Sequence, residues 1–444
     1  MKLSLPIKLA VFVVLLLAAV LNVACAADTA SLVILHTNDL HGQMRAEKDN
    51  PGAARIAAYF RQVREKHPNV LVLDAGDSVS GTPLSLLFEG EPIFEIMSAM
   101  KYDAAVLGNH EFDYGYKKIR KYRELAAHPL LCANAFAPDN SLLADAPYRI
   151  LDAGGVRGGI IGVILESTPV HIIRAGNEGI RFTPQIEAVR KIVPRIRKKC
   201  DLIIALTHLD EGEDTALAKA VDGIDLIVNG HSDMLEKPVK AGNTFIVQAG
   251  EHGTYIGRVE IKIDLKNRKI IGLEGKLIKA SDLPLPDAEI GKLVDKWEKK
   301  ITEKLDIRIA TSTRTIEEEE VKELFEKIIR QVTGADLAYY NLGGIRKKIY
   351  EGDVTVRDVW KIEPFGNTIV KLKIKGEDLG GVLLEELKAS GVKIEPDREY
   401  TVATNNFIAE RTENEIGSPV AGSVNTHVLV RDAVIEYIKK NGID

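Results

Sequence analysis

Residues 106–113, with the sequence VLGNHEFD, place an amide, an imidazole and two carboxylates directly after a strand-like apolar run. Asn109 offers an oxygen ligand to a divalent metal ion, and His110 can donate a proton or stabilise developing negative charge. Asp113 follows His110 by three residues, so a helical turn here would put both side chains on one face. There the carboxylate could orient the imidazole and hold it in its cationic form. The stretch therefore predicts a catalytic pair, His110 and Asp113, beside a metal ligand.

Similar polar residues recur at the ends of four other predicted strands. In open α/β sheets the loops at the carboxyl ends of the strands converge, and ligands bind there. A single histidine after a strand is more often a surface or core residue than a ligand, and Gly-Asp pairs are common in turns. Agreement at five strand ends is much less expected by chance, so it favours one shared site. The candidate metal ligands are Asp39, His41, Asp77, Asn109, His208, His231 and Asp233.

The mixture of carboxylate, imidazole and amide donors indicates which ions this site would bind. Such donors suit zinc, manganese, iron or cobalt better than magnesium or calcium alone. No thiolate is among them, so a structural zinc site is not expected. The candidate donors exceed the needs of one tetrahedral ion but fit two ions that share a carboxylate at roughly 3.5–4 Å separation. We therefore predict two divalent metal ions, manganese, zinc, cobalt or iron.

The remaining histidines lack this pattern. We assign structural roles to a group that consists of His36, His67, His128, His171 and His427. His252 lies in the segment Gly-Glu-His-Gly near the expected rim of the site, and the sequence leaves its role open.

The elements that would position these residues follow from hydrophobic periodicity. Short apolar runs alternate with amphipathic stretches from residue 31 to about residue 277, which indicates an α/β domain. The predicted strands cover residues 32–36, 70–74, 104–107, 202–207 and 226–229, and the predicted helices cover 53–66, 92–101, 116–127 and 184–199. Residues 244–248, 255–264 and 269–277 are predicted to form antiparallel strands, with a turn at 266–268.

The composition changes at residues 283–286, Leu-Pro-Leu-Pro, and a charged amphipathic stretch follows. A second, smaller α/β domain comes after it, with helices predicted near residues 317–333, 376–390 and 431–441. We predict four parts, which are an export signal at 1–27, an N-terminal domain at 28–283, a linker helix at 284–306 and a C-terminal domain at 307–444.

The beginning of the chain is typical of an export signal. Lys2 and Lys8 precede the apolar stretch 9–21, and small residues follow it. We expect an exported protein of the periplasm or cell envelope, with cleavage favoured and lipid attachment at Cys25 as an alternative. A retained anchor is disfavoured because the stretch is short for a membrane-spanning helix.

Charge and cysteine content narrow the remaining possibilities. The 444 residues carry a formal net charge of −5 without a basic stripe, so nucleic acid is not expected as the main partner. A small molecule is the expected ligand, and no obligatory protein partner is indicated. Cys132 and Cys200 lie beside apolar runs and are predicted to be buried free thiols, with a disulfide between them as the alternative.

The polar motifs at the strand ends allow a comparison with known protein families. The chain resembles the calcineurin-like metallophosphoesterases, and more narrowly the 5'-nucleotidase and UDP-sugar hydrolase family. The similarity covers nearly the whole mature chain and rests on NDLHG at 38–42, GD at 76–77, GNHEFD at 108–113, TH at 207–208 and GHSD at 230–233. It implies an N-terminal metallophosphoesterase sandwich, a linker helix and a smaller C-terminal substrate-binding domain.

The resemblance also implies roles for single residues. Asp233 stands where the family places a further ligand to the first ion, often an amide or imidazole, so an acid there is a departure. His110 with Asp113 matches the catalytic dyad of the family. By the same resemblance, Asp39 and His41 would hold one ion, Asp77 would bridge, and the other ion would be held by Asn109, His208 and His231.

The C-terminal part resembles the substrate-binding domain of the family through NLGGIR at 341–346, EPFGN at 363–367 and TNNF at 404–407. An arginine beside a Gly-Gly turn can approach a phosphate or carboxylate unhindered. Two phenylalanines could sandwich a base, a contact worth roughly 1–3 kcal/mol per base. The substrate-binding residues implied are Asn341, Gly343, Gly344, Arg346, Phe365 and Phe407.

Two features of this part depart from the family. The Gly-Gly-Asp-Gly segment after the second phenylalanine is replaced by residues 409–415, AERTENE. The arginine-containing motif and the following helix at the start of the domain are shortened, and Arg314 is a candidate counterpart of the arginine.

The expected function is hydrolysis of phosphomonoesters, above all nucleoside 5'-monophosphates, by an exported enzyme with two metal ions. The alternatives are the same chemistry on 2',3'-cyclic nucleotides, nucleotide sugars or a sulfur-linked substrate. A non-catalytic nucleotide- or metal-binding protein is disfavoured because the catalytic pair and all ligand positions are retained together.

Overall fold

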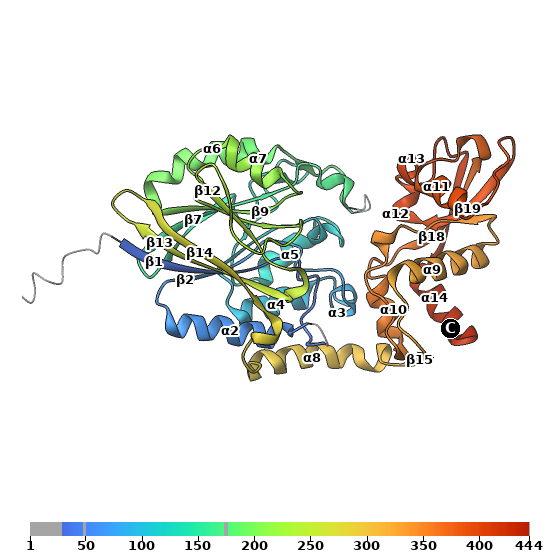
Figure 1. The fold of residues 1–444 in the computed structure, drawn as a ribbon, viewed down its shortest axis with the longest axis horizontal. Coiled ribbons are helices and arrows are strands. Elements are labelled where there is room, and N and C mark those ends of the chain that lie inside the picture. The colour runs from blue at the N-terminus through green and yellow to red at the C-terminus, as the bar shows by residue number, and fades with distance from the viewer. Residues whose placement is uncertain (1–28, 48–49, 173–175, 444) are drawn as a thin grey trace, which may run out of the picture.

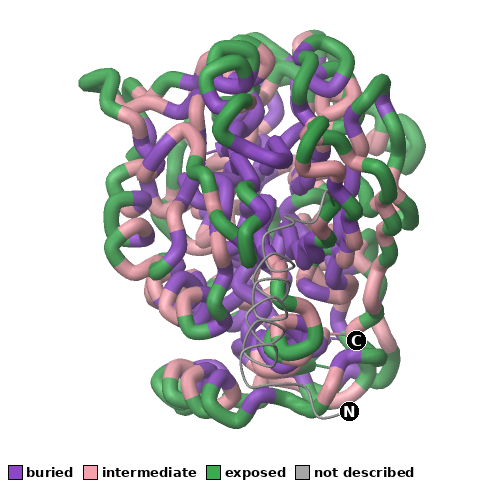
Figure 2. The backbone as a smooth tube through the Cα atoms, turned by 90° about the vertical axis from the view of Figure 1, so that its left-hand side faces the viewer, coloured by how far each residue is buried: buried purple, intermediate pink, exposed green. Residues whose placement is uncertain are grey.

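A computed structural model describes residues 29–47, 50–172 and 176–443 of the chain (Figure 1). The predicted export signal at 1–27, including Cys25, lies outside the described residues. A larger layered body occupies one side of Figure 1, and a smaller body follows at the other side. Buried residues are concentrated in the interior, and exposed residues lie at the periphery (Figure 2).

The first sheet of the larger body has the strand order β14-β13-β1-β2-β3-β4. Its central pairs β1–β2, β2–β3 and β3–β4 are parallel, whereas β13 pairs antiparallel with both β1 and β14. The predicted antiparallel arrangement of residues 255–264 and 269–277 is therefore confirmed. The strands are β1 (Thr29–Thr37), β2 (Val70–Asp74), β3 (Ala104–Val106), β4 (Leu130–Leu131), β13 (Tyr255–Asp264) and β14 (Lys269–Lys279).

The second sheet has the order β11-β12-β10-β9-β7-β6. The sequence prediction for residues 244–248 is wrong in part, because β12 pairs parallel with β10 and is antiparallel only to the short edge strand β11. The strands are β6 (Tyr148–Ala153), β7 (Val156–Ile164), β9 (Leu202–His208), β10 (Leu226–Gly230), β11 (Val239–Ala241) and β12 (Thr244–Gln248).

The two sheets pack face to face around one apolar layer. Alternate residues of β1, such as Leu32 and Ile34, meet Ile204 and Leu206 of β9 in this layer, and nearly all are fully buried. Opposite residues of the same strands pack under helices, so each central strand is apolar on both faces. In Figure 1, α6 and α7 cover one side and α2 and α4 the other. The helices are α2 (Gly52–Lys66), α3 (Pro83–Leu87), α4 (Glu91–Met100), α5 (Lys118–Leu125), α6 (Gln185–Ile196) and α7 (Glu213–Ala220).

A long helix, α8 (Ala288–Leu305), connects the sandwich to the smaller body and lies within the predicted linker (Figure 1). Asp287 caps its first turn by accepting hydrogen bonds from two backbone amides, as aspartate commonly does. The Trp297 indole packs against Phe88 and donates to Glu95, which fixes the helix to the sandwich. The next residue, Glu298, accepts a 2.8 Å hydrogen bond from the buried Arg357 of the smaller body.

The smaller body contains a four-stranded sheet, β16-β19-β18-β20, between two helical layers. Apolar residues of α9 and α14 cover one face, and Leu383 and Ile408 from the opposite helices cover the other. The predicted helix at 376–390 is wrong in its first part, since a 3-10 turn (Gly376–Asp378) precedes α11. The strands are β15 (Arg308–Ser312), β16 (Leu337–Ala338), β17 (Gly352–Thr355), β18 (Thr368–Lys375), β19 (Glu399–Asn405) and β20 (Gly422–Leu429). The helices are α9 (Glu318–Thr333), α10 (Val356–Ile362), α11 (Gly381–Ala389), α12 (Asn406–Ala409), α13 (Thr412–Glu415) and α14 (Val430–Asn441).

Cys132 and Cys200 are both buried and free, which confirms the predicted thiols and excludes the disulfide alternative in this structure. Within the described ranges, no helix has the length and apolar composition that a membrane span requires.

Burial of His128 predicts a pH-dependent stability. Burial lowers its pKa from 6.5 to about 4, and neither ring nitrogen has a hydrogen-bond partner. Between these pH values the unfolded chain binds the proton and the folded chain does not, so stability falls as the pH falls through 6.5. At pH 5 the expected cost is about 2 kcal/mol, and at pH 7 it nearly vanishes.

His128→Leu removes this cost, so the variant should gain stability over the natural chain at pH 5 by more than it does at pH 7. Urea unfolding of both proteins at the two pH values measures the difference. An equal stability difference at both pH values would contradict the assignment.

Candidate metal and nucleotide site

The carboxyl ends of β1, β2, β3, β9 and β10 bring most of the predicted metal ligands together around Asp77. An Asp77 carboxylate oxygen lies 3.2 Å from Nε2 of His208 and 3.9 Å from Nε2 of His110. The same His208 nitrogen lies 3.1 Å from the side-chain oxygen of Asn109. Asp39 lies beside this group, where it accepts a hydrogen bond of 3.0 Å from the backbone amide of His231.

Two sets of potential ligand atoms meet at Asp77. In each set the three donor atoms lie within 4.8 Å of one another, and the sets are His41, Asp77, His110 and Asp77, His208, His231. Asp77 is common to both sets, as a ligand shared by two neighbouring ions must be, and His110 is the one member whose expected role is catalytic. The donors present, carboxylates and imidazoles without thiolate, fit divalent transition metals.

The backbone at these positions is strained. Asp39, His41, Asp77, His231 and His252 all have positive φ angles, between 46° and 76°. Residues with a Cβ rarely adopt this conformation, and such strain concentrates at functional sites because surrounding contacts must maintain it. Strain at five neighbouring polar residues therefore supports a binding role rather than a purely structural one.

Glu111 maintains the loop of Asp77, a role that the sequence analysis did not identify. It is buried, and its carboxylate accepts hydrogen bonds from the backbone amides of Asp77, Ser78 and Gly108 at 3.1, 2.9 and 2.6 Å. A Cβ atom on Gly108 would lie 2.2 Å from a carboxylate oxygen of Asp77, so only glycine permits this approach. The GNHE motif thus positions Asp77 as well as supplying Asn109 and His110.

Charges in the cluster compensate one another. Burial alone lowers the pKa of His208, but the carboxylates of Asp77 and Asp39 outweigh it and raise the pKa to about 10. Burial of Asp77 opposes its ionisation, yet the nearby histidines, His208 first, hold its pKa well below the usual range. The cluster therefore favours positive charge next to Asp77, which is the property a cation site needs.

His110 and Asp113 form the close pair that their spacing predicts. Nδ1 of His110 lies 2.7 Å from Asp113, in and directly after the 3-10 turn His110–Phe112. Burial alone would lower the pKa of His110, but Asp113 and Asp77 outweigh it and raise the pKa to about 9. The imidazole is therefore a cation near neutral pH, able to donate from Nε2.

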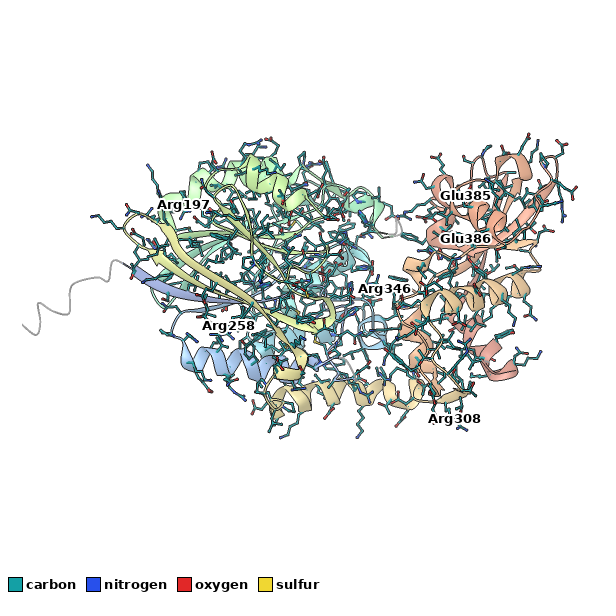
Figure 3. The ribbon with its side chains drawn as sticks, in the orientation of Figure 1. Arg197, Arg258, Arg308, Arg346, Glu385 and Glu386 are labelled. Carbon is teal, nitrogen blue, oxygen red and sulfur yellow. The ribbon has the colours of Figure 1, made fainter. Side chains whose placement is uncertain are left out.

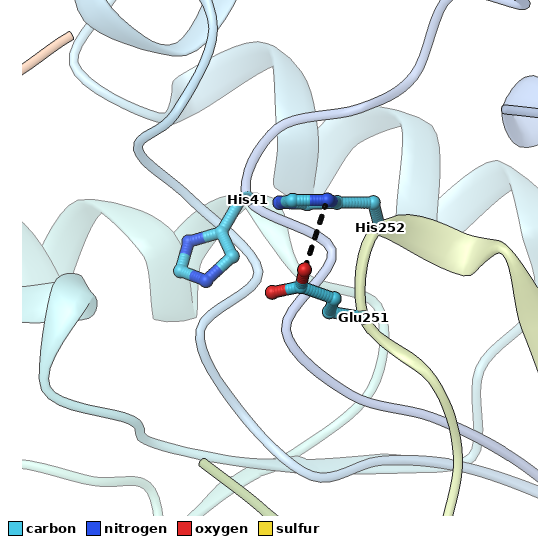
Figure 4. Close-up of side chains that lie close together, drawn as sticks. All are labelled: His41, Glu251 and His252. Atoms are coloured by element: carbon cyan, nitrogen blue, oxygen red, sulfur yellow. Dashed lines mark ion pairs between the residues drawn. The ribbon is translucent and has the colours of Figure 1, made fainter. Parts of the chain in front are cut away.

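Asp233 lies apart from these donor sets. Its side chain is exposed, although it lines the same cavity as Asp39, His41 and Asp77. Glu251 and His252 instead join His41 in a third set of donors within 4.8 Å of one another. Figure 4 shows the outer edge of the His252 ring turned toward His41, with Glu251 3.7 Å from Nδ1. The sequence left His252 open because no strand-end pattern places it here.

This placement predicts unequal effects of two substitutions on metal affinity. Asp233→Ala should change the Kd for Mn²⁺ little, because an exposed carboxylate must turn inward to reach an ion. His252→Ala should raise the Kd roughly 10-fold, as loss of a residue next to a metal ligand commonly does. Titration calorimetry of the metal-free protein measures both. The reverse order of effects would restore Asp233 as the fourth ligand of the first ion.

His171, to which the sequence analysis assigns a structural role, lies next to the predicted ligand His231. Their ring centroids are 5.4 Å apart, and Nε2 of His231 lies 3.1 Å from Asp210. His171 also lines the cavity that contains His110, so it lies at the candidate site, where the sequence did not place it. His171, Asp210 and His231 also form a set of potential ligand atoms within 4.8 Å of one another.

A cavity of about 380 Å³ lies between the larger and smaller bodies, next to His110 and Asp113. This volume is in the range of small-molecule sites. All predicted substrate-binding residues line it, namely Asn341, Gly343, Gly344, Arg346, Phe365 and Phe407. Arg346 lies on the face of the smaller body that is turned toward the sandwich (Figure 3). A second cavity of about 490 Å³ contains Asp39, His41 and Asp77 and shares His110, His231 and Arg346 with the first.

Phe365 reaches this cavity from a turn held by a buried carboxylate. Glu363 accepts hydrogen bonds from the amides of Gly366 and Asn367, and Gly366 supplies the positive φ of the turn. The Phe365 ring stacks near His110, with centroids 6.1 Å apart and planes 26° apart. The Arg346 guanidinium lies 5.9 Å from the same ring centroid. Arg314, by contrast, is paired with Glu320 and does not line the cavity.

Comparisons with known proteins agree with this arrangement. Residues 32–233 match the family described as calcineurin-like phosphoesterase, and residues 299–390 match the 5'-nucleotidase C-terminal domain. A 5'-nucleotidase of Vibrio cholerae is 32% identical over 79% of this chain and 74% of its own length. Protein UshA of Yersinia enterocolitica is 28% identical over 93% of this chain and 92% of its own.

A solved structure shows the same fold. The 5'-nucleotidase precursor of Thermus thermophilus superimposes with a TM-score of 0.82 at 24% identity, covering 94% of this chain and 97% of that one. The two-part α/β fold expected from the sequence is thereby confirmed. Together with the matched domains, the relatives place this chain in the 5'-nucleotidase family of calcineurin-like phosphoesterases, which are hydrolases of ester bonds.

Proposed function

We propose that this chain is an exported phosphatase with two divalent metal ions that converts nucleoside 5'-monophosphates to nucleosides and phosphate. The observation that carries the proposal is the cavity in which His110 faces Phe365 and Arg346. Catalytic, anion-binding and aromatic side chains line one space of suitable size. The sequence features of residues 1–27 support export.

The proposed ligands of the ions surround Asp77, which would be shared. Asp39 and His41, with His252 or Asp233 at the outer side, would hold the first ion. Asn109, His208 and His231 would hold the second. Such ions supply Lewis acidity, which activates water at neutral pH and neutralises charge on the phosphate.

The side chains that line the cavity have separate proposed roles. His110, kept cationic by Asp113, donates a hydrogen bond to the phosphate and can protonate the departing alkoxide. Arg346 lies where the two cavities meet and can bind a phosphate oxygen. Phe365 and Phe407 offer flat apolar faces to the base.

The second cavity supports a further candidate substrate. It is lined by Ser232, Glu251 and Tyr255 in addition to the proposed metal ligands, and neither Phe365 nor Phe407 lines it. A larger phosphate substituent, as in a nucleotide sugar, has room there. Cyclic nucleotides and sulfur-linked esters remain alternatives of the same chemistry.

Phosphate release by the metal-reconstituted protein tests the proposal. The panel contains the nucleoside 5'-monophosphates, a 2',3'-cyclic nucleotide, a nucleotide sugar and p-nitrophenyl phosphate. We expect the highest kcat/KM for a 5'-monophosphate and loss of activity after chelation. Turnover of p-nitrophenyl phosphate without preference for nucleotides would contradict the proposal that nucleotides are the substrates. Nucleotide binding without turnover would favour a binding protein.

A further inference from the structure

The segment that replaces the family's glycine-rich stretch contains Arg411, between the short helices α12 and α13. Its guanidinium crosses to the larger body. Nε donates to the carbonyl of Val170 at 3.3 Å, and Nη2 donates to the carbonyl of Ile172 at 2.8 Å. These contacts join residues about 240 positions apart in the sequence, from opposite sides of the proposed nucleotide cavity.

The same guanidinium also contacts Phe407. Its central carbon lies 4.1 Å from the centroid of the Phe407 ring, and Nη1 donates to the Phe407 carbonyl at 3.1 Å. The side chain is only 25% exposed. The face of the Arg411 guanidinium therefore packs on the Phe407 ring, while its edge donates hydrogen bonds to the opposite wall of the cavity. Contacts of this kind are strongest when partly shielded from water.

Only arginine has the geometry for both tasks. A planar guanidinium can stack on a ring with its face while its edge donates to several carbonyl oxygens. A lysine ammonium carries a compact charge and cannot bind the ring and two separated carbonyls in this way.

Val170 and Phe407 both line the cavity, so the contacts of Arg411 lie where its two walls meet. We infer that Arg411 is a positioning residue for the nucleotide base, acting by fixing the ring of Phe407 and tying it to the 170–172 loop. This inference rests on the proposed nucleotide substrate. The inference also gives a role to residues 409–415, which stand where the family has a glycine-rich segment.

Kinetics of Arg411→Ala and Arg411→Lys test the inference. For a nucleoside monophosphate we expect KM to rise roughly 10-fold with a smaller change in kcat, as loss of a shielded ring contact predicts. The effect on p-nitrophenyl phosphate, which has no base, should be clearly smaller. Arg398→Ala is the matched control, because Arg398 stacks on Tyr400 at 4.6 Å and pairs with Asp336 of its own body.

Lysine should fail to restore the KM of the natural protein. An unchanged KM in Arg411→Ala, or equal losses on both substrates, would overturn the inference.

Hydrogen exchange of the substrate-free protein provides a readout that is independent of nucleotide turnover. The backbone amides of residues 166–172 and 406–416 should exchange faster in Arg411→Ala than in the natural protein. In Arg398→Ala their exchange should be unchanged. Unchanged exchange in Arg411→Ala would refute the tie between the walls. If the natural protein hydrolyses p-nitrophenyl phosphate but no nucleotide, the proposed function fails, and exchange still decides whether Arg411 joins the walls.

Discussion

His110→Ala is expected to lower kcat about 100- to 10,000-fold, the range typical of a lost positioned acid. The imidazole lies 2.7 Å from Asp113 and lines the proposed substrate cavity. Its bond to Asp113 and the neighbouring Asp77 keep it cationic, so its removal takes a hydrogen-bond donor from the reacting phosphate. Phosphate release under saturating substrate measures the effect.

Metal content separates this role from that of a ligand. The bound ions, counted by elemental analysis after gel filtration, should equal those of the natural protein. His67→Ala is a suitable control, because His67 contacts Arg258 and lines neither of the two cavities. If His110→Ala lost its ions together with its activity, the side chain would be a ligand and the catalytic assignment would be wrong.

Asp77→Asn is expected to abolish activity by a different route. The Asp77 carboxylate belongs to both central donor sets, and its charge compensates the histidines around it. An amide keeps the shape of the side chain but not the charge, so both ions should bind more than about 100-fold more weakly, beyond the usual effect of an outer-shell change.

The fold should survive Asp77→Asn, because Glu111 holds this loop through backbone amides rather than through the Asp77 side chain. An unchanged circular dichroism spectrum would establish this. Calorimetric titration with Mn²⁺ measures the affinity. Two equivalents bound with the affinity of the natural protein would exclude Asp77 as the shared ligand.

The sequence predicts the central strands and their polar ends well, for a physical reason. Strands covered on both faces are short and almost wholly apolar, and the donors follow them directly in Asp39, Asp77, Asn109 and His208. Parallel strands place such ends at one edge of the sheet, so proximity follows from topology. The edge strand β11, with which β12 pairs antiparallel, was not predicted. It has no comparable apolar pattern because it is short and mostly exposed.

Other parts of the site depend on contacts that spacing does not encode. The role of Glu111 rests on amides from two separate loops, and His252 reaches His41 from a turn far along the chain. Asp233 follows a strand end as a ligand would, yet its exposed placement is visible only in three dimensions. The contacts of Arg411 require the two bodies to face each other, and no sequence pattern reports that arrangement.

Whether two ions share Asp77 is shown most directly by anomalous diffraction from crystals grown with Mn²⁺. Two peaks are expected roughly 3.5–4 Å apart, one on each side of the Asp77 carboxylate. One peak should lie toward His41 and the other toward His208 and His231. A single peak, or peaks that do not contact Asp77, would rule out a pair of ions that share this carboxylate.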